Sequence, residues 1–126
     1  MIEINNTTAF AIDKTLILKI AKAVLVKENP PKARRAFRRA DISIALVNPR
    51  RARQLNMTYR KKHYVPNVLS FDYGEIVLCP EKIRQDAKKY GILFERELAR
   101  VFMHGLLHLL GYSHAQMKKF KTNFRT

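Results

Sequence analysis

The sequence has few acidic residues, one cysteine and no hydrophobic run long enough to cross a bilayer. Its single cysteine, Cys79, excludes an intramolecular disulfide and fits a reducing compartment, where it would pack as a small hydrophobic residue. The most apolar early stretch, residues 16–26, carries Lys19 and Lys22, so it is too short and too charged for a membrane span or a signal peptide. We therefore expect a cytoplasmic protein with no membrane partner.

Repeats and low-complexity segments are also missing. No Gly/Ser-rich stretch interrupts the 126 residues, and hydrophobic residues make up 47% of them. A chain of this length can bury one hydrophobic core but is short for two. The sequence therefore predicts a single domain over residues 1–126.

The scarcity of acidic residues leaves the chain strongly basic. Twenty-five Lys and Arg stand against 10 Asp and Glu, which gives a net charge of +15. The basic residues gather at residues 32–39, 50–53, 60–62 and 118–121. One such cluster could be an ordinary solvated surface, but four with little acid between them favour contact with the phosphates of a nucleic acid.

Hydrophobic periodicity predicts both strands and helices. We expect strands at residues 2–4, 41–47, 68–72 and 75–79, with the last two forming a hairpin. Helices are expected at residues 13–28, 49–60, 80–90 and 94–110, the second capped by Asn48 and the last stopped by Gly111. The helix at 49–60 is expected to bury Ala52, Leu55 and Tyr59, and the helix at 80–90 to place Ile83, Ala87 and Tyr90 on one face.

Three of the four histidines fall within the segment HGLLHLLGYSH, residues 104–114. His104 and His108 are four residues apart on the last predicted helix, so their rings project from one face. Gly111 can adopt a left-handed conformation that turns His114 back toward them. Single histidines on apolar helices are usually core residues, but this count and spacing favour three imidazoles around one divalent cation. One Zn²⁺ per chain suits these ligands best, although imidazoles also accept Ni²⁺ or Cu²⁺.

The same spacing occurs in the metzincin protease signature, H-E-x-x-H-x-x-G-x-x-H, with one informative difference. Gly105 stands where that signature has the glutamate that acts as general base. Peptide hydrolysis is therefore not expected. A glycine within a helix costs about 1 kcal/mol relative to alanine, so Gly105 serves either a close approach of two backbones or ordinary packing.

Several segments resemble one known family. HGLLHLLGYSH resembles the HGxLHLxGYDH signature of the YbeY family of rRNA maturation endoribonucleases. The upstream stretch LNMTYRKKHYVPNVLSFDYGEIVLCPE is similar to that family's LNxxYR, PTDVLSF and GDIxIxP blocks, in the same order. The resemblance covers about residues 41–114, most of the chain.

The resemblance implies an α+β fold, in which a small mixed sheet of four strands packs with helices and the metal site lies at the end of a buried helix. It also implies a zinc ion held by His104, His108 and His114. The implied activity is endonucleolytic cleavage of single-stranded RNA in rRNA processing and ribosome quality control, with rRNA or the small ribosomal subunit as partner. The family's functionally important arginine falls on Arg60, which we expect to hold a phosphate oxygen in the transition state.

A group of arginines in the first basic cluster is expected to guide the RNA backbone: Arg34, Arg35, Arg38 and Arg39.

Two departures from the family pattern concern residues expected around the metal ligands. Ser113 replaces the aspartate before the third histidine, and Pro66-Asn67 replaces Thr-Asp. Ser113 and Glu75 are then the residues expected to hydrogen-bond around the metal ligands. Asp72, Glu75 and metal-bound water all remain candidate general bases. A zinc-stabilised RNA-binding factor without catalytic activity, acting in ribosome assembly, is the alternative function.

Overall fold

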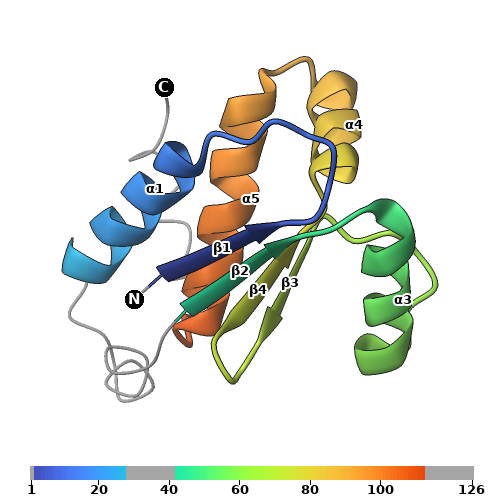
Figure 1. Ribbon diagram of the computed structural model, residues 1–126, viewed down its shortest axis with the longest axis horizontal. Helices are drawn as coiled ribbons and strands as arrows, with labels where there is room; N and C mark the ends of the chain where they lie inside the picture. The colour runs from blue at the N-terminus through green and yellow to red at the C-terminus, as the bar shows by residue number, and fades with distance from the viewer. Residues whose placement is uncertain (1, 28–41, 113–126) are drawn as a thin grey trace.

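The computed structural model describes residues 2–27 and 42–112, and these form four helices and four strands. Figure 1 shows their arrangement as an α+β domain, which confirms the predicted fold class. In chain order the elements are β1 (Ile2–Asn6), α1 (Lys14–Lys27), β2 (Ile42–Leu46), α3 (Pro49–Arg60), β3 (Val68–Phe71), β4 (Glu75–Leu78), α4 (Pro80–Tyr90) and α5 (Phe94–Leu109).

The four strands form one mixed sheet in the order β1-β2-β4-β3. β1 and β4 both pair parallel to β2, whereas β3 pairs antiparallel to β4. The predicted hairpin is thus present, and its turn is closed by the N–H of Gly74, which donates to the carbonyl of Phe71 at 2.9 Å. Because β3 is an edge strand, one side of its backbone faces away from the sheet.

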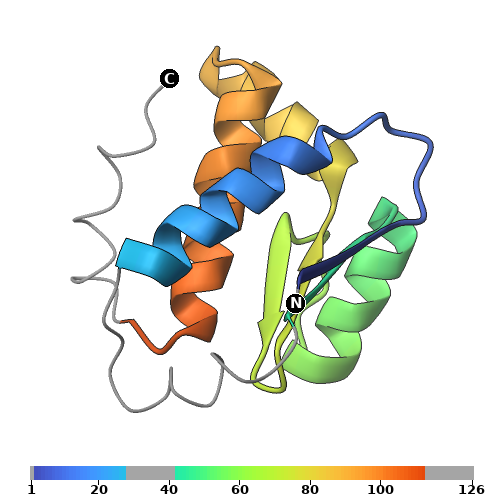
Figure 2. The ribbon, with the colours of Figure 1, turned by 60° about the vertical axis from the view of Figure 1, so that its left-hand side comes forward.

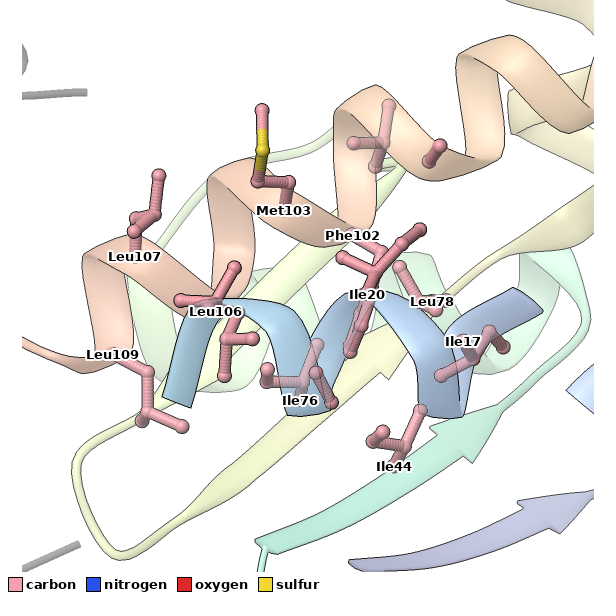
Figure 3. Close-up of a cluster of buried hydrophobic side chains, with 14 of the residues drawn as sticks. Ile17, Ile20, Ile44, Ile76, Leu78, Phe102, Met103, Leu106, Leu107 and Leu109 are labelled. Atoms are coloured by element: carbon pink, nitrogen blue, oxygen red, sulfur yellow. The ribbon is translucent and has the colours of Figure 1, made fainter. Parts of the chain in front are cut away.

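Helices α1 and α5 cover one face of the sheet (Figure 2). Alternate residues of the strands point toward these helices and are fully buried, among them Ile44, Ile76 and Leu78. Figure 3 shows these side chains in one cluster with Ile17 of α1 and Phe102 of α5. This core fixes α5, the helix that carries His104 and His108, against the sheet.

Helix α3 covers the opposite face, where Ala52 packs with Leu69 and Val77 in a second cluster. The side chain of Asn48 caps this helix as predicted, accepting the N–H of Arg51 at 2.8 Å. Cys79 is also buried in this cluster, which confirms its predicted packing role. Burial raises the pKa of the Cys79 thiol.

The prediction that Tyr59 is buried was wrong, because this side chain is 64% exposed. Tyr59 lies in the last turn of α3, above the end of the edge strand, where it contacts the ring of Phe71. Asn56, one turn earlier, is fully buried instead. Tyr90, at the end of α4, is likewise 61% exposed, whereas Ile83 and Ala87 on the same face are buried.

An ion pair between a buried glutamate and a half-exposed arginine was not expected from the sequence. Glu97, in the first turn of α5, has a fully buried side chain, and its carboxylate accepts hydrogen bonds from Arg100 Nε at 2.7 Å and Nη2 at 2.8 Å. Hydrogen bonding to Glu97 raises the pKa of the Arg100 guanidinium. Two parallel hydrogen bonds satisfy a carboxylate that would otherwise be costly to bury.

Across residues 2–27 and 42–112, no helix combines the length and the hydrophobicity that a membrane crossing would need.

Candidate metal and phosphate site

A pocket of about 250 Å³ opens beside β3, between α3 and α5. Its lining comes from three separate segments of the chain: Arg60, Val68, Leu69, Ser70, His104, Gly105 and His108. The fold thus brings two of the predicted metal ligands together with the predicted catalytic arginine.

The two histidines project from the last turns of α5 with their rings nearly parallel. The ring centroids of His104 and His108 are 6.5 Å apart and the ring planes differ by 4°. A zinc-bound imidazole nitrogen lies about 2.0 Å from the ion. Two rings on one helix face are therefore placed to share a common cation. Imidazole nitrogens are ligands that zinc accepts, and the zinc site itself stays a prediction.

Gly105, between these histidines, allows α5 to lie directly against β3. A β-carbon built at this position would come within 2.7 Å of Val68 Cγ2 and 3.3 Å of Ser70 Oγ. The hydroxyl of Ser70 also donates to the carbonyl of Gly105 at 2.8 Å. The space at Gly105 is thus taken by side chains of β3 and β4 packed against the helix backbone, which favours the packing reason over a close approach of two backbones.

Arg60 reaches the pocket from the last turn of α3 and is positioned by a buried amide. The side-chain oxygen of Asn56 accepts from Arg60 Nη1 at 3.4 Å, while its Nδ2 donates to the carbonyl of Tyr64 at 3.0 Å. Lys61 ends the helix in a left-handed conformation, with φ 58°. Asn56 therefore ties the arginine to the loop that leads into β3. Sequence reasoning missed this role, although Asn56 belongs to the LNMTYR block that carries the family resemblance.

The chain turns at Gly111, as predicted, with φ 86°. The N–H of Gly111 donates to the carbonyl of His108 at 3.0 Å, and that of Tyr112 donates to Leu107 at 3.1 Å. His114 and Ser113 follow this turn outside the described residues, so the third ligand and its neighbour remain predictions. Within the described segments, no three His, Cys, Asp or Glu side chains gather closely enough to hold a metal.

The four predicted RNA-guiding residues also lie outside the described residues: Arg34, Arg35, Arg38 and Arg39.

Glu75 lies on the α3 side of the sheet, where its carboxylate accepts a hydrogen bond from the hydroxyl of Tyr73 at 2.9 Å. This placement follows from strand alternation, because its neighbour Ile76 faces α5. Asn67 points to α4, donating to Asp86 Oδ2 at 3.4 Å. Asp72 is exposed in the hairpin turn. Among the described residues, therefore, the pocket is lined by no carboxylate.

The chain is similar to several known proteins. The family model described as "Endoribonuclease YbeY" matches residues 2–125. The chain belongs to the YbeY family. A relative from Bdellovibrio bacteriovorus, named Endoribonuclease YbeY, is 39% identical over 82 residues, which cover 60% of this chain and 55% of that protein. A YbeY relative from Thermodesulfovibrio yellowstonii is 40% identical over 84 residues, covering 58% of this chain and 53% of the relative.

A solved structure is also similar to this YbeY chain. The solution structure of TM1509 from Thermotoga maritima superposes with a TM-score of 0.60 and 25% identity, covering 96% of this chain and 87% of that one. By sequence, however, this YbeY chain spans little more than half the length of the curated relatives above. The similarity to these proteins therefore establishes the family and the fold.

Proposed function

We propose that this YbeY-family chain is a metal-dependent endoribonuclease that cleaves single-stranded RNA in rRNA maturation and ribosome quality control. The observation that carries the proposal is the pocket beside β3, because it joins His104, His108 and Arg60 around one space. Imidazoles on one side and a guanidinium on the other suit a phosphodiester held between a cation and an arginine. The strongly basic chain supports a polyanionic substrate.

In this proposal His104 and His108, with His114, hold one Zn²⁺. When bound there, zinc would supply concentrated positive charge and Lewis acidity. Arg60 donates to a non-bridging phosphate oxygen as negative charge builds there, and Asn56 keeps the guanidinium directed toward the pocket. Helix α5, which carries the two histidines, is held close against β3 by the Ser70 hydrogen bond and by the absence of a side chain at Gly105.

A second function is favoured by one specific observation, the lack of a carboxylate in the described lining of the pocket. Without a nearby base, the same residues could form a zinc-stabilised site that binds RNA without cleaving it. The chain would then act as a ribosome assembly factor. Both functions have the same metal site and the same fold.

Arg60→Ala separates these two functions. For an enzyme, single-turnover cleavage should fall by about 10² or more while RNA affinity changes little, because Arg60 acts mainly in the transition state. Arg96→Ala is the matched control, since Arg96 is an exposed arginine of α5 that does not line the pocket. For a binding protein, the wild type would show no metal-dependent cleavage, and Arg60→Ala would weaken binding by about one phosphate contact.

A further inference from the structure

Three aromatic side chains meet at the end of the β3 edge strand. The rings of Phe71 and Tyr73 are stacked, with centroids 5.6 Å apart and planes at 25°. Tyr59 of α3 meets Phe71 edge-on at 5.2 Å and 79°. Phe71 is partly buried against the core under α3, but Tyr73 is 71% exposed and Tyr59 remains largely in solvent. We call Tyr59, Phe71 and Tyr73 the aromatic trio.

The trio lies next to the metal and phosphate pocket along two separate segments. Tyr59 directly precedes Arg60, and Phe71 directly follows Ser70; both Arg60 and Ser70 line the pocket. β3 is at the edge of the sheet, and no described strand pairs with its outer side. Phe71 faces α3 and packs against the cluster that contains Leu69, another residue that lines the pocket. A chain-like ligand that leaves the pocket across this edge toward α3 would therefore meet the trio.

The charges around the trio differ on its two sides. Helix α3 has no acidic residue, and the exposed Arg60, Lys61 and Lys62 follow Tyr59. Asp72 and Glu75 flank Tyr73 on the other side. Phosphates are therefore favoured along the end of α3 and disfavoured over the hairpin turn, where uncharged groups are better placed.

The outermost ring is held in place, although it is exposed. The hydroxyl of Tyr73 donates to Glu75 Oε1 at 2.9 Å, and one face of its ring rests on Phe71. Partial desolvation, together with this hydrogen bond, raises the pKa of the Tyr73 phenol. A fixed ring loses less side-chain entropy on binding than a freely rotating one.

We propose that the aromatic trio is a stacking platform for the bases of the single-stranded RNA whose phosphate occupies the pocket beside Arg60. This inference rests on the proposed function, because it takes RNA as the ligand of the pocket. The backbone follows Arg60, Lys61 and Lys62, while bases extend the stack that Phe71 and Tyr73 begin. Every base has a π-face, so the platform tolerates many sequences, and it requires bases that are not already paired in a duplex.

Binding to a single-stranded 2′-O-methyl RNA that carries 2-aminopurine tests the platform, because the fluorescence of this base is quenched when it stacks. A matched oligonucleotide with abasic sites measures the phosphate contribution alone. The variants are Tyr59→Leu and Tyr73→Leu, which remove the ring, and Tyr73→Phe, which keeps it. Tyr90→Leu is the control, because Tyr90 is an equally exposed tyrosine on α4.

Tyr73→Leu should weaken binding of the base-containing RNA by about 5-fold to 150-fold and reduce the quenching, since a stacked base contributes about 1–3 kcal/mol. Its affinity for the abasic RNA should not change, and Tyr90→Leu should bind both RNAs as the wild type does. Tyr73→Phe keeps the ring but removes its hydrogen bond to Glu75, so its affinity for the base-containing RNA should lie between those of Tyr73→Leu and the wild type. Equal affinity and quenching in Tyr59→Leu, Tyr73→Leu and the wild type would overturn the proposal. Loss of self-association in Tyr73→Leu, with RNA binding unchanged, would also overturn it and assign the trio to a second copy of the chain.

The cleavage assay with Arg60→Ala is independent of this result. Ring-dependent binding without any metal-dependent cleavage would contradict the enzyme and leave the platform standing. Metal-dependent cleavage with ring-independent binding would contradict the platform alone.

Discussion

Substituting Gly105 tests whether the close contact of α5 with β3 positions the histidines. In Gly105→Ala the new methyl would lie 2.7 Å from Val68 Cγ2, about 1 Å closer than two carbon atoms normally pack. Overpacking of this kind costs about 1–3 kcal/mol. Replacing a helical glycine by alanine stabilises the helix by about 1 kcal/mol. The net loss in the free energy of unfolding should therefore be about 0–2 kcal/mol.

The double variant with Val68→Ala isolates the contact. Val68→Ala alone removes partly buried methyl groups and should cost on the order of 1 kcal/mol. In the double variant the clash is absent, so its destabilisation should be smaller than the sum of the two single losses by about 1–3 kcal/mol. Zinc affinity, lowered in Gly105→Ala by the displaced helix, should recover in the double variant.

Urea unfolding followed by circular dichroism measures these energies in a chain that has no tryptophan. Val47→Ala is the control for the cycle, because Val47 is buried on the α3 side of the sheet. Its effect should add to that of Gly105→Ala within about 0.5 kcal/mol. The reasoning would be refuted if the stability losses of Gly105→Ala and Val68→Ala added as closely as those of Gly105→Ala and the control Val47→Ala.

Two further predictions concern buried groups. Asn56→Ala should lower the free energy of unfolding by about 1–3 kcal/mol, because it removes the hydrogen-bond partner of the Tyr64 carbonyl. It should also slow RNA cleavage, because Arg60 loses its contact with Asn56, whereas the exposed control Thr58→Ala should cleave at the wild-type rate. Wild-type cleavage by Asn56→Ala would contradict the positioning role. Burial raises the pKa of the Cys79 thiol above its ordinary value of 9.0. The contribution of the neutral thiol to the free energy of unfolding should therefore be full below pH 9.0 and be lost as the pH rises above that value. A thiol reagent should modify Cys79 only as the protein unfolds, and rapid labelling of the folded protein would contradict its burial.

The sequence predicted most elements because their signals are local. Asn48 and Pro49 mark the start of α3, and Gly91 and Gly111 adopt the positive φ angles expected where α4 and α5 end. The pair His104 and His108 was predictable for the same reason, since helical spacing alone puts both on one face.

Features that depend on tertiary packing were not predictable in this way. Tyr59 has the right spacing for burial, but its exposure depends on the edge strand beneath it, which helical periodicity does not reveal. The buried states of Asn56 and Glu97 depend on partners that only the folded chain supplies. Glu75 was expected near the metal, yet strand alternation turns its side chain toward α3. Which face of the sheet a β4 residue occupies depends on how β4 pairs with its neighbours, and the sequence alone does not reveal that pairing.

Zinc titration of metal-depleted protein, with cleavage of a single-stranded RNA as the readout, tests the central claim most directly. Cleavage should rise with added Zn²⁺ and level off near one equivalent per chain, as expected for one site of three imidazoles. His108→Ala should neither retain the metal against a chelator nor cleave RNA at any zinc concentration tested. If wild-type protein saturated with zinc cleaves RNA no faster than His108→Ala, the chain is not the metal-dependent nuclease that we propose.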